Sequence, residues 1–98
     1  GTVYTMSGKL IIKNLACRSD FKPIEEDCPC YACQHFSRAY IRHLFQTNEI
    51  LGMRMASLHN ITFYLRLVHK VRDVIFEGRF KEWHDAFLEN YTDKGATD

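Results

Sequence analysis

The chain begins with two short stretches in which β-branched, aromatic and aliphatic residues predominate. Residues 2–5 read Thr-Val-Tyr-Thr, and residues 9–13 carry three consecutive aliphatic side chains between two lysines. Ser7-Gly8 lies between them and is a turn signal. The pattern therefore predicts a β-hairpin over residues 2–13. Residues 14–27 follow neither the strand nor the helix period, and we expect an extended linker there.

Most of the remaining chain follows the helical period. A helix is predicted over about residues 36–46, with Ser37 as its N-cap. A short helix over residues 48–51 is expected to stop at Gly52. A long helix is then expected from Leu58, capped by Ser57, to about Phe76. After Gly78, residues 80–90 carry two aromatic rings at i and i+4, which predicts a packed terminal helix.

The long helix has an unusually wide apolar arc. Its apolar positions are Leu58, Ile61, Tyr64, Leu65, Val68, Val71 and Ile75, widened by Phe63, Leu67 and Val74. An arc this wide normally needs cover on two sides, and one small hairpin offers little cover. We therefore expect a larger body of protein to pack on this helix. His59 falls on the polar stripe and is expected to face away from the main core.

Composition limits the class of protein. The 98 residues fit one domain, and 46% hydrophobic with 26% charged residues exclude intrinsic disorder as the main state. Thirteen Lys and Arg against twelve Asp and Glu give a net charge of +1, so any RNA contact needs a local patch. The acidic run at residues 25–27 is interpreted as a solvated face.

No apolar run approaches the ~18 residues of a membrane span, and no membrane partner is expected. The chain starts at Gly1 without an initiator Met, and we expect it to be part of something longer.

Three of the four cysteines lie within six positions. They are Cys28, Cys30 and Cys33, whereas Cys17 stands apart. A C-x-C-x-x-C cluster closes only small, strained disulfide loops. We therefore expect a tight bend that aims three thiolates at one metal ion. Structural zinc takes four nitrogen or sulfur ligands in a tetrahedron. Cysteines that bind a metal instead of forming disulfides indicate a reducing, cytoplasmic setting.

The fourth ligand must come from Cys17 or from a histidine. The histidines are His35, His43, His59, His69 and His84. His35 is too close to Cys33 to swing back easily, and three others fall inside helical patterns. His59 lies where the long helix is expected to begin, and we favour it. Completion by Cys17 stays open, as do an iron–sulfur cluster, which would need Cys17, and merely buried thiols. A redox C-x-x-C motif is disfavoured because Cys28 adds a third thiol and no βαβ pattern surrounds it.

The helix over residues 36–46 carries two further sets of candidate side chains. Phe36, Tyr40 and His43 share one stripe, which predicts either a contact surface or packing within the domain. Arg38 and Arg42 are spaced i, i+4 and are weak candidates for contacts with RNA phosphates. For these arginines we favour a solvated surface, because the net charge argues against a dedicated RNA platform.

Several of these motifs together resemble a known family. They are the segments Asp27-Cys28-Pro29-Cys30-Tyr31-Ala32-Cys33, Phe36–Phe45, Glu49-Ile50-Leu51-Gly52 and Leu58-His59-Asn60. The chain resembles the C-terminal part of bacterial tRNA-guanine transglycosylase, also called queuine tRNA-ribosyltransferase. The opening Gly1–Thr5 and the pair Asp20-Phe21 fit too, so the resemblance covers nearly all of the chain.

The resemblance implies an architecture. The chain would be an α+β fragment: a β-hairpin with a zinc-binding loop and helices, from the C-terminal part of a TIM (β/α) barrel. Its zinc ligands would be Cys28, Cys30, Cys33 and His59, binding one Zn²⁺ per chain, with Cys17 as a small apolar filler. The expected parts are a hairpin and linker (1–27), a zinc-binding subdomain (28–59), the last barrel helix and terminal helix (60–91) and a frayed tail (92–98).

The resemblance also implies a function for the parent protein. The family exchanges guanine at the wobble position of tRNA for a deazaguanine precursor of queuosine, using one aspartate as nucleophile and another as general acid and base. Both lie upstream of Gly1 in the family, so this chain is expected to hold no catalytic residue. A homodimer built with the zinc subdomain is implied as well. The alternative is a free-standing structural zinc module that binds protein or RNA.

Overall fold

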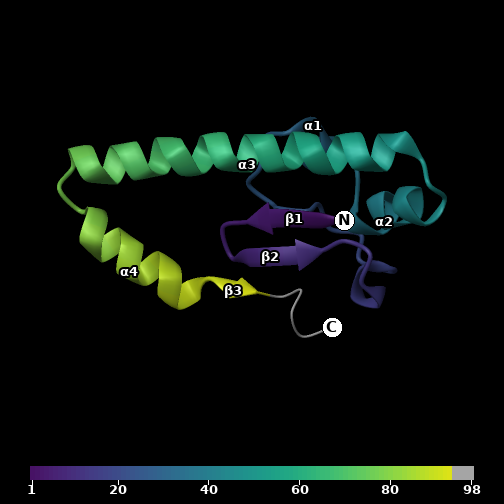
Figure 1. Ribbon diagram of the computed structural model, residues 1–98, viewed down its shortest axis with the longest axis horizontal. Helices are drawn as coiled ribbons and strands as arrows, with labels where there is room; N and C mark the ends of the chain where they lie inside the picture. Colours follow the sequence, from purple (N-terminus) through teal and green to yellow (C-terminus); the bar gives the residue numbers. More distant parts are fainter. Residues whose placement is uncertain (94–98) are drawn as a thin grey trace.

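The computed structural model describes residues 1–93, which form a small α+β unit. Its elements are β1 (Thr2–Thr5), β2 (Gly8–Ile11), η1 (Leu15–Cys17), α1 (Tyr31–His35), α2 (Arg38–Gln46), α3 (Ile50–Phe76), α4 (Phe80–Asn90) and β3 (Thr92–Asp93). The predicted hairpin and α+β class are confirmed. Figure 1 shows α3 running along the sheet and α4 turning back toward it.

The sheet has the order β1-β2-β3. β1 and β2 pair antiparallel with Val3 opposite Leu10, and both side chains are buried, as the two-residue period of a half-buried strand requires. β3 pairs parallel to β2, with Gly8 opposite Thr92. Thr92 and Asp93, the first residues of the predicted tail, form this pair because α4 returns the chain to the unpaired edge of β2. The rest of the predicted tail, residues 94–98, lies outside the described residues.

The predicted N-cap of α2 is confirmed, since the Ser37 hydroxyl accepts a hydrogen bond from the Tyr40 amide at 3.1 Å. The prediction of two separate helices over residues 48–51 and 58–76 is wrong. α3 is one helix of 27 residues, and Ser57 is an exposed residue inside it. α3 also continues past residue 59, where the expected zinc-binding subdomain ends.

Gly52 explains that error. It does not end a helix but lies where α3 crosses α2. A Cβ atom at this position would meet the Leu44 Cβ at 3.0 Å and the Phe45 backbone nitrogen at 3.3 Å. The missing side chain therefore allows the two helices to approach closely, which is the other common use of glycine.

The buried positions of α3 follow the helical period along one side. They are Gly52, Met55, Ala56, His59, Phe63 and Val74. Of the predicted apolar arc, Phe63 and Val74 are buried, but most of the other large side chains are exposed; Ile61, Leu65 and Val68 are each more than half accessible. The prediction that His59 faces away from the core is therefore wrong. Small residues one and two turns before His59 bring its side of α3 against the rest of the molecule, and the cysteine loop is part of the core there.

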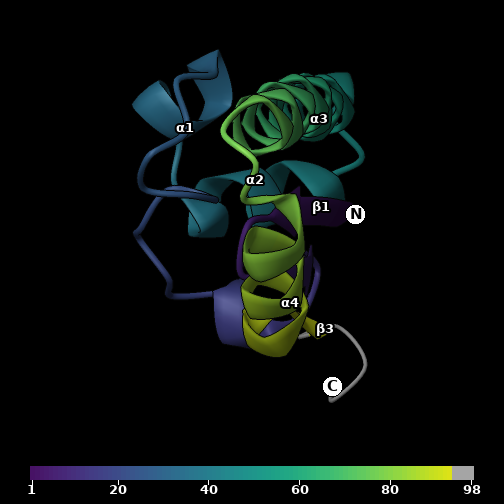
Figure 2. The same ribbon diagram turned by 90° about the vertical axis from the view of Figure 1, so that its left-hand side faces the viewer.

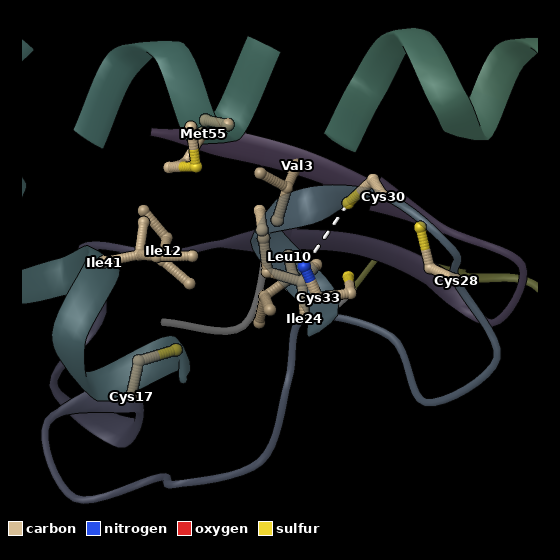
Figure 3. Close-up of a cluster of buried hydrophobic side chains, with 12 residues drawn as sticks. Val3, Leu10, Ile12, Cys17, Ile24, Cys28, Cys30, Cys33, Ile41 and Met55 are labelled. Atoms are coloured by element: carbon tan, nitrogen blue, oxygen red, sulfur yellow. Dashed lines mark hydrogen bonds between the residues drawn. The ribbon is translucent and has the colours of Figure 1, made fainter. Parts of the chain in front are cut away.

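The core lies between α3, the hairpin and α2. Figure 2 looks along α3 and shows α1 beside it, with α2 and the sheet beneath. Figure 3 shows the aliphatic side chains Val3, Leu10, Ile12, Ile24 and Ile41 in one cluster with the cysteines. Among residues 1–93, no helix has both the length and the hydropathy that crossing a membrane requires.

Candidate metal centre

A short helix that the sequence patterns did not predict positions the cysteines. Cys30 is the N-cap of α1, and its Sγ accepts a hydrogen bond from the Cys33 amide at 3.4 Å. The two sulfurs therefore lie on one side of the first turn of α1 (Figure 3). Cys28 precedes them in a turn that is closed by a bond from its amide to the Glu25 carbonyl at 3.3 Å. The bend gathers three thiols without help from a longer element.

His59 comes to these thiols from the middle of α3. Its Nδ1 lies 3.5 Å from the Sγ of Cys28, 3.7 Å from that of Cys30 and 3.3 Å from that of Cys33. All four ligand atoms lie within 4.8 Å of one another. A tetrahedral zinc ion with Zn–S near 2.3 Å and Zn–N near 2.05 Å holds nitrogen and sulfur about 3.6 Å apart. The four side chains therefore have the spacing that this ion needs.

The hydrogen bond of the other ring nitrogen of His59 fixes the tautomer of the imidazole. Nε2 donates its hydrogen to the Tyr4 carbonyl of β1 at 2.7 Å. This bond selects the tautomer in which the Nδ1 lone pair is free, and that nitrogen faces the sulfurs. A backbone carbonyl in this role left no signal in the sequence, because every residue carries one.

Burial sets the electrostatics of the cluster. Each of the four side chains is at most 9% exposed. Burial raises the pKa of the Cys28 and Cys33 thiols and lowers the pKa of the His59 imidazole. Thiolates in this cavity therefore need a nearby cation, and a divalent ion of the zinc type supplies that charge. A donor set of three sulfurs and one nitrogen suits zinc. Four protein ligands leave no position for water, which is typical of a structural site.

Comparison with known proteins agrees with this geometry. The sequence model of the family described as queuine tRNA-ribosyltransferase matches residues 1–93. The chain belongs to this family. It is 47% identical over 91 residues to a queuine tRNA-ribosyltransferase of Natranaerobius thermophilus and 46% identical over 94 residues to one of Fusobacterium nucleatum. These matches cover 93% and 96% of this chain but 25% of each relative. The chain therefore spans about a quarter of the length of the curated relatives that it matches.

Cys17, the other thiol that was considered as a ligand, lies away from the cluster in this member of the queuine tRNA-ribosyltransferase family. Its side chain is buried at the end of η1, and Figure 3 places it on the far side of the core from Cys28. The group of side chains that could hold a metal contains His59 and not Cys17. Its position fits the apolar filler that we expected.

The acidic run before the cysteines is not simply a solvated face. One oxygen of Glu25 accepts a bond from the Met6 amide at 2.8 Å, and the other accepts a bond from the Arg66 guanidinium at 3.2 Å. The Glu25 side chain is only 14% exposed. It therefore ties the hairpin turn, the cysteine loop and α3 together. The earlier interpretation was wrong for Glu25, because an acidic run does not reveal which carboxylate has buried donors in reach.

Arg38 and Arg42 both have partners within the chain. The Arg38 guanidinium bonds to the Asp20 carboxylate at 3.1 Å and to the carbonyls of Pro23 and Ile24 at 3.1 and 2.8 Å. It therefore fastens the linker before the cysteines to α2. The Nε of Arg42 donates to the Lys13 carbonyl at 3.2 Å.

The candidate contact residues of α2 form a row of rings. The Phe36 and Tyr40 centroids lie 5.3 Å apart, and those of Tyr40 and His43 lie 6.4 Å apart. Tyr31 extends the row from α1, with its ring 5.9 Å from that of Phe36. Tyr40 and Tyr31 are 43% and 55% exposed, whereas Phe36 packs partly against the core. Phe36 therefore packs inward, whereas Tyr40 and Tyr31 lie at the surface.

Proposed function

We propose that this chain is the zinc-binding C-terminal part of a tRNA-guanine transglycosylase, in which Cys28, Cys30, Cys33 and His59 hold one Zn²⁺. The closed three-sulfur, one-nitrogen cluster carries this proposal. The ion fixes the bend at the cysteines to the middle of α3, in a unit too small to be held by apolar burial alone. Its role is structural.

The parent protein exchanges guanine at the anticodon wobble position for a queuosine precursor base. The catalytic aspartates lie outside this chain, and the chain by itself is inactive. Family membership supports this assignment, as does a site that offers no open coordination position. The need for reduced thiolates supports a cytoplasmic location for the parent.

The exposed apolar arc of α3 supports a place in a larger barrel. Ile61, Leu65, Val68 and Ile75 are each more than half accessible, which is unusual for large aliphatic side chains along one side of a helix. We propose that α3 is the last helix of a TIM barrel and that this side packs on barrel strands. Relatives about four times as long have the chain length that such a barrel needs.

The row of rings on α2 is proposed to form part of a homodimer interface. Phe36, Tyr40 and His43 are the central residues, because a row of stacked rings that includes exposed ones fits the core of an interface better than an isolated surface position does. tRNA is proposed to bind the dimer. Among the two arginines, Arg42 keeps more of its guanidinium free for a phosphate than Arg38 does.

Two measurements on purified protein test the proposed function. Metal analysis of the chain is expected to give one zinc per chain, and His59→Ala is expected to abolish tight binding. In the full-length parent, labelled guanine is expected to exchange into tRNA. Zinc without exchange in the full-length protein would instead favour the free-standing module that binds protein or RNA. An absence of zinc would refute the structural role of the cluster.

A further inference from the structure

Within residues 1–93, no strand neighbours β1 on the side that faces α3. Its other side pairs with β2, so the backbone groups of Thr2 and Tyr4 on the free side would otherwise lack partners. Figure 1 shows α3 lying beside this edge of β1. The partners come from two consecutive side chains of α3, His59 and Asn60.

Asn60 bonds to β1 as the backbone of a neighbouring strand would. Its Oδ1 accepts a hydrogen bond from the Tyr4 amide at 3.0 Å, and its Nδ2 donates to the Thr2 carbonyl at 3.0 Å. A carboxamide suits this task because it carries one acceptor and two donors in a plane. An aspartate at this position could accept from Tyr4 but could not donate to Thr2.

The bonds of Asn60 act on the residue that orients the metal ligand. Asn60 holds the amide of Tyr4, and the carbonyl of the same residue receives the Nε2 hydrogen of His59 at 2.7 Å. A shift of the Tyr4 carbonyl would release the imidazole, whose Nδ1 lies 3.3–3.7 Å from three sulfurs.

We propose that Asn60 is a positioning residue for the zinc site: by fixing β1 it holds the Tyr4 carbonyl that aims the His59 ring at the cysteines. This proposal rests on the proposed zinc site. Asn60 is not one of the four side chains that would hold the ion, and its effect passes through Tyr4 and His59. Outer partners of metal ligands commonly change metal affinity by about 10- to 100-fold when they are removed.

The test measures how fast zinc leaves the chain to a chromophoric chelator. Asn60→Ala is expected to release zinc about 10- to 100-fold faster than the wild type. Alanine favours the helix more than asparagine does, so a weaker α3 would not explain the result. Asn60→Asp, which keeps an acceptor for the Tyr4 amide but sets a carboxylate oxygen against the Thr2 carbonyl, is also expected to release zinc faster than the wild type.

Val74→Ala is the matched control for general loss of stability. Val74 is fully buried in α3, about four turns beyond His59. Its variant is expected to keep the wild-type release rate. Equal rates for wild type and Asn60→Ala, or equal acceleration in Val74→Ala, would overturn the proposal while leaving the zinc site intact. A wild-type chain that holds no zinc would overturn both.

A second measurement on the wild type keeps the proposal testable if the Asn60 variants do not fold. Nitrogen-15 spectra of the zinc-loaded chain are expected to show a protonated Nε2 on His59. Hydrogen exchange is expected to show a protected Tyr4 amide, although that amide points away from β2. A Tyr4 amide that exchanges as fast as an open edge would overturn the role of Asn60.

Discussion

The continuity of α3 makes a prediction that two alanine substitutions can test. Gly52 and Ser57 look like a helix end and a helix start in the sequence, but both lie within one helix. If they were a stop and a cap, Ser57→Ala would cost about 1 kcal/mol of stability through the lost cap. In the middle of a helix, the same change replaces an exposed serine with a better helix former. It is therefore expected to raise the free energy of unfolding by up to about 0.5 kcal/mol.

Gly52→Ala brings two opposing effects into competition. An alanine inside a helix gains about 1 kcal/mol over glycine. The new methyl group, however, would stand 3.0 Å from the Leu44 Cβ and 3.3 Å from the Phe45 nitrogen, atoms that belong to the core of α2 and cannot swing away. Overpacking of this kind costs about 1–3 kcal/mol. The expected net result is a loss of between about 0 and 2 kcal/mol, despite the better helix propensity.

Urea unfolding of the zinc-saturated chain, followed by circular dichroism, measures both changes. Saturating zinc keeps the contribution of the ion the same in all three proteins. The two substitutions are expected to have opposite signs, with Ser57→Ala above and Gly52→Ala at or below the wild type. A gain of about 1 kcal/mol from Gly52→Ala would refute the close approach of α2 and α3. A loss of about 1 kcal/mol from Ser57→Ala would refute the continuous helix.

Three further predictions concern the metal, the loop and the interface. Complete removal of zinc by a strong chelator is expected to lower the helical circular dichroism signal, and adding zinc back is expected to restore it. An unchanged spectrum would contradict the structural role of the ion. Glu25→Ala is expected to cost about 1.5–3 kcal/mol, because the Arg66 guanidinium and the Met6 amide lose their acceptor. Glu26→Ala, the exposed neighbour, is expected to change stability by less than about 0.5 kcal/mol, and equal costs would refute the distinction. In the full-length enzyme, Tyr40→Ala is expected to shift the particle mass from dimer toward monomer, and an unchanged dimer would remove α2 from the proposed interface.

The cluster of ligands was accessible from the sequence because it depends on residue identity. Three cysteines in six positions have few uses other than a metal, and His59 was the histidine that a chain reversal could return to them. The orientation of His59 was not accessible. The apolar arc of α3 pointed toward a core on the opposite side, and that side is exposed in this chain.

The wrong prediction of a helix end at Gly52 and a helix start at Ser57 has a physical cause. Glycine serves both as a helix end and as a site of close approach, and only the neighbouring helix decides which use applies at Gly52. Backbone partners are similarly invisible in a sequence. The Tyr4 carbonyl and the pairing of Thr92 with β2 depend on how distant segments meet, not on side-chain types. Glu25 differs from Glu26 for the same reason.

X-ray absorption at the zinc edge of the purified chain tests the central claim most directly. The account predicts one zinc per chain with three sulfur neighbours at about 2.3 Å and one nitrogen neighbour at about 2.0 Å. Four sulfur neighbours, or a first shell with a water oxygen in place of the ring nitrogen, would contradict the assignment of His59 as the ligand that closes the site.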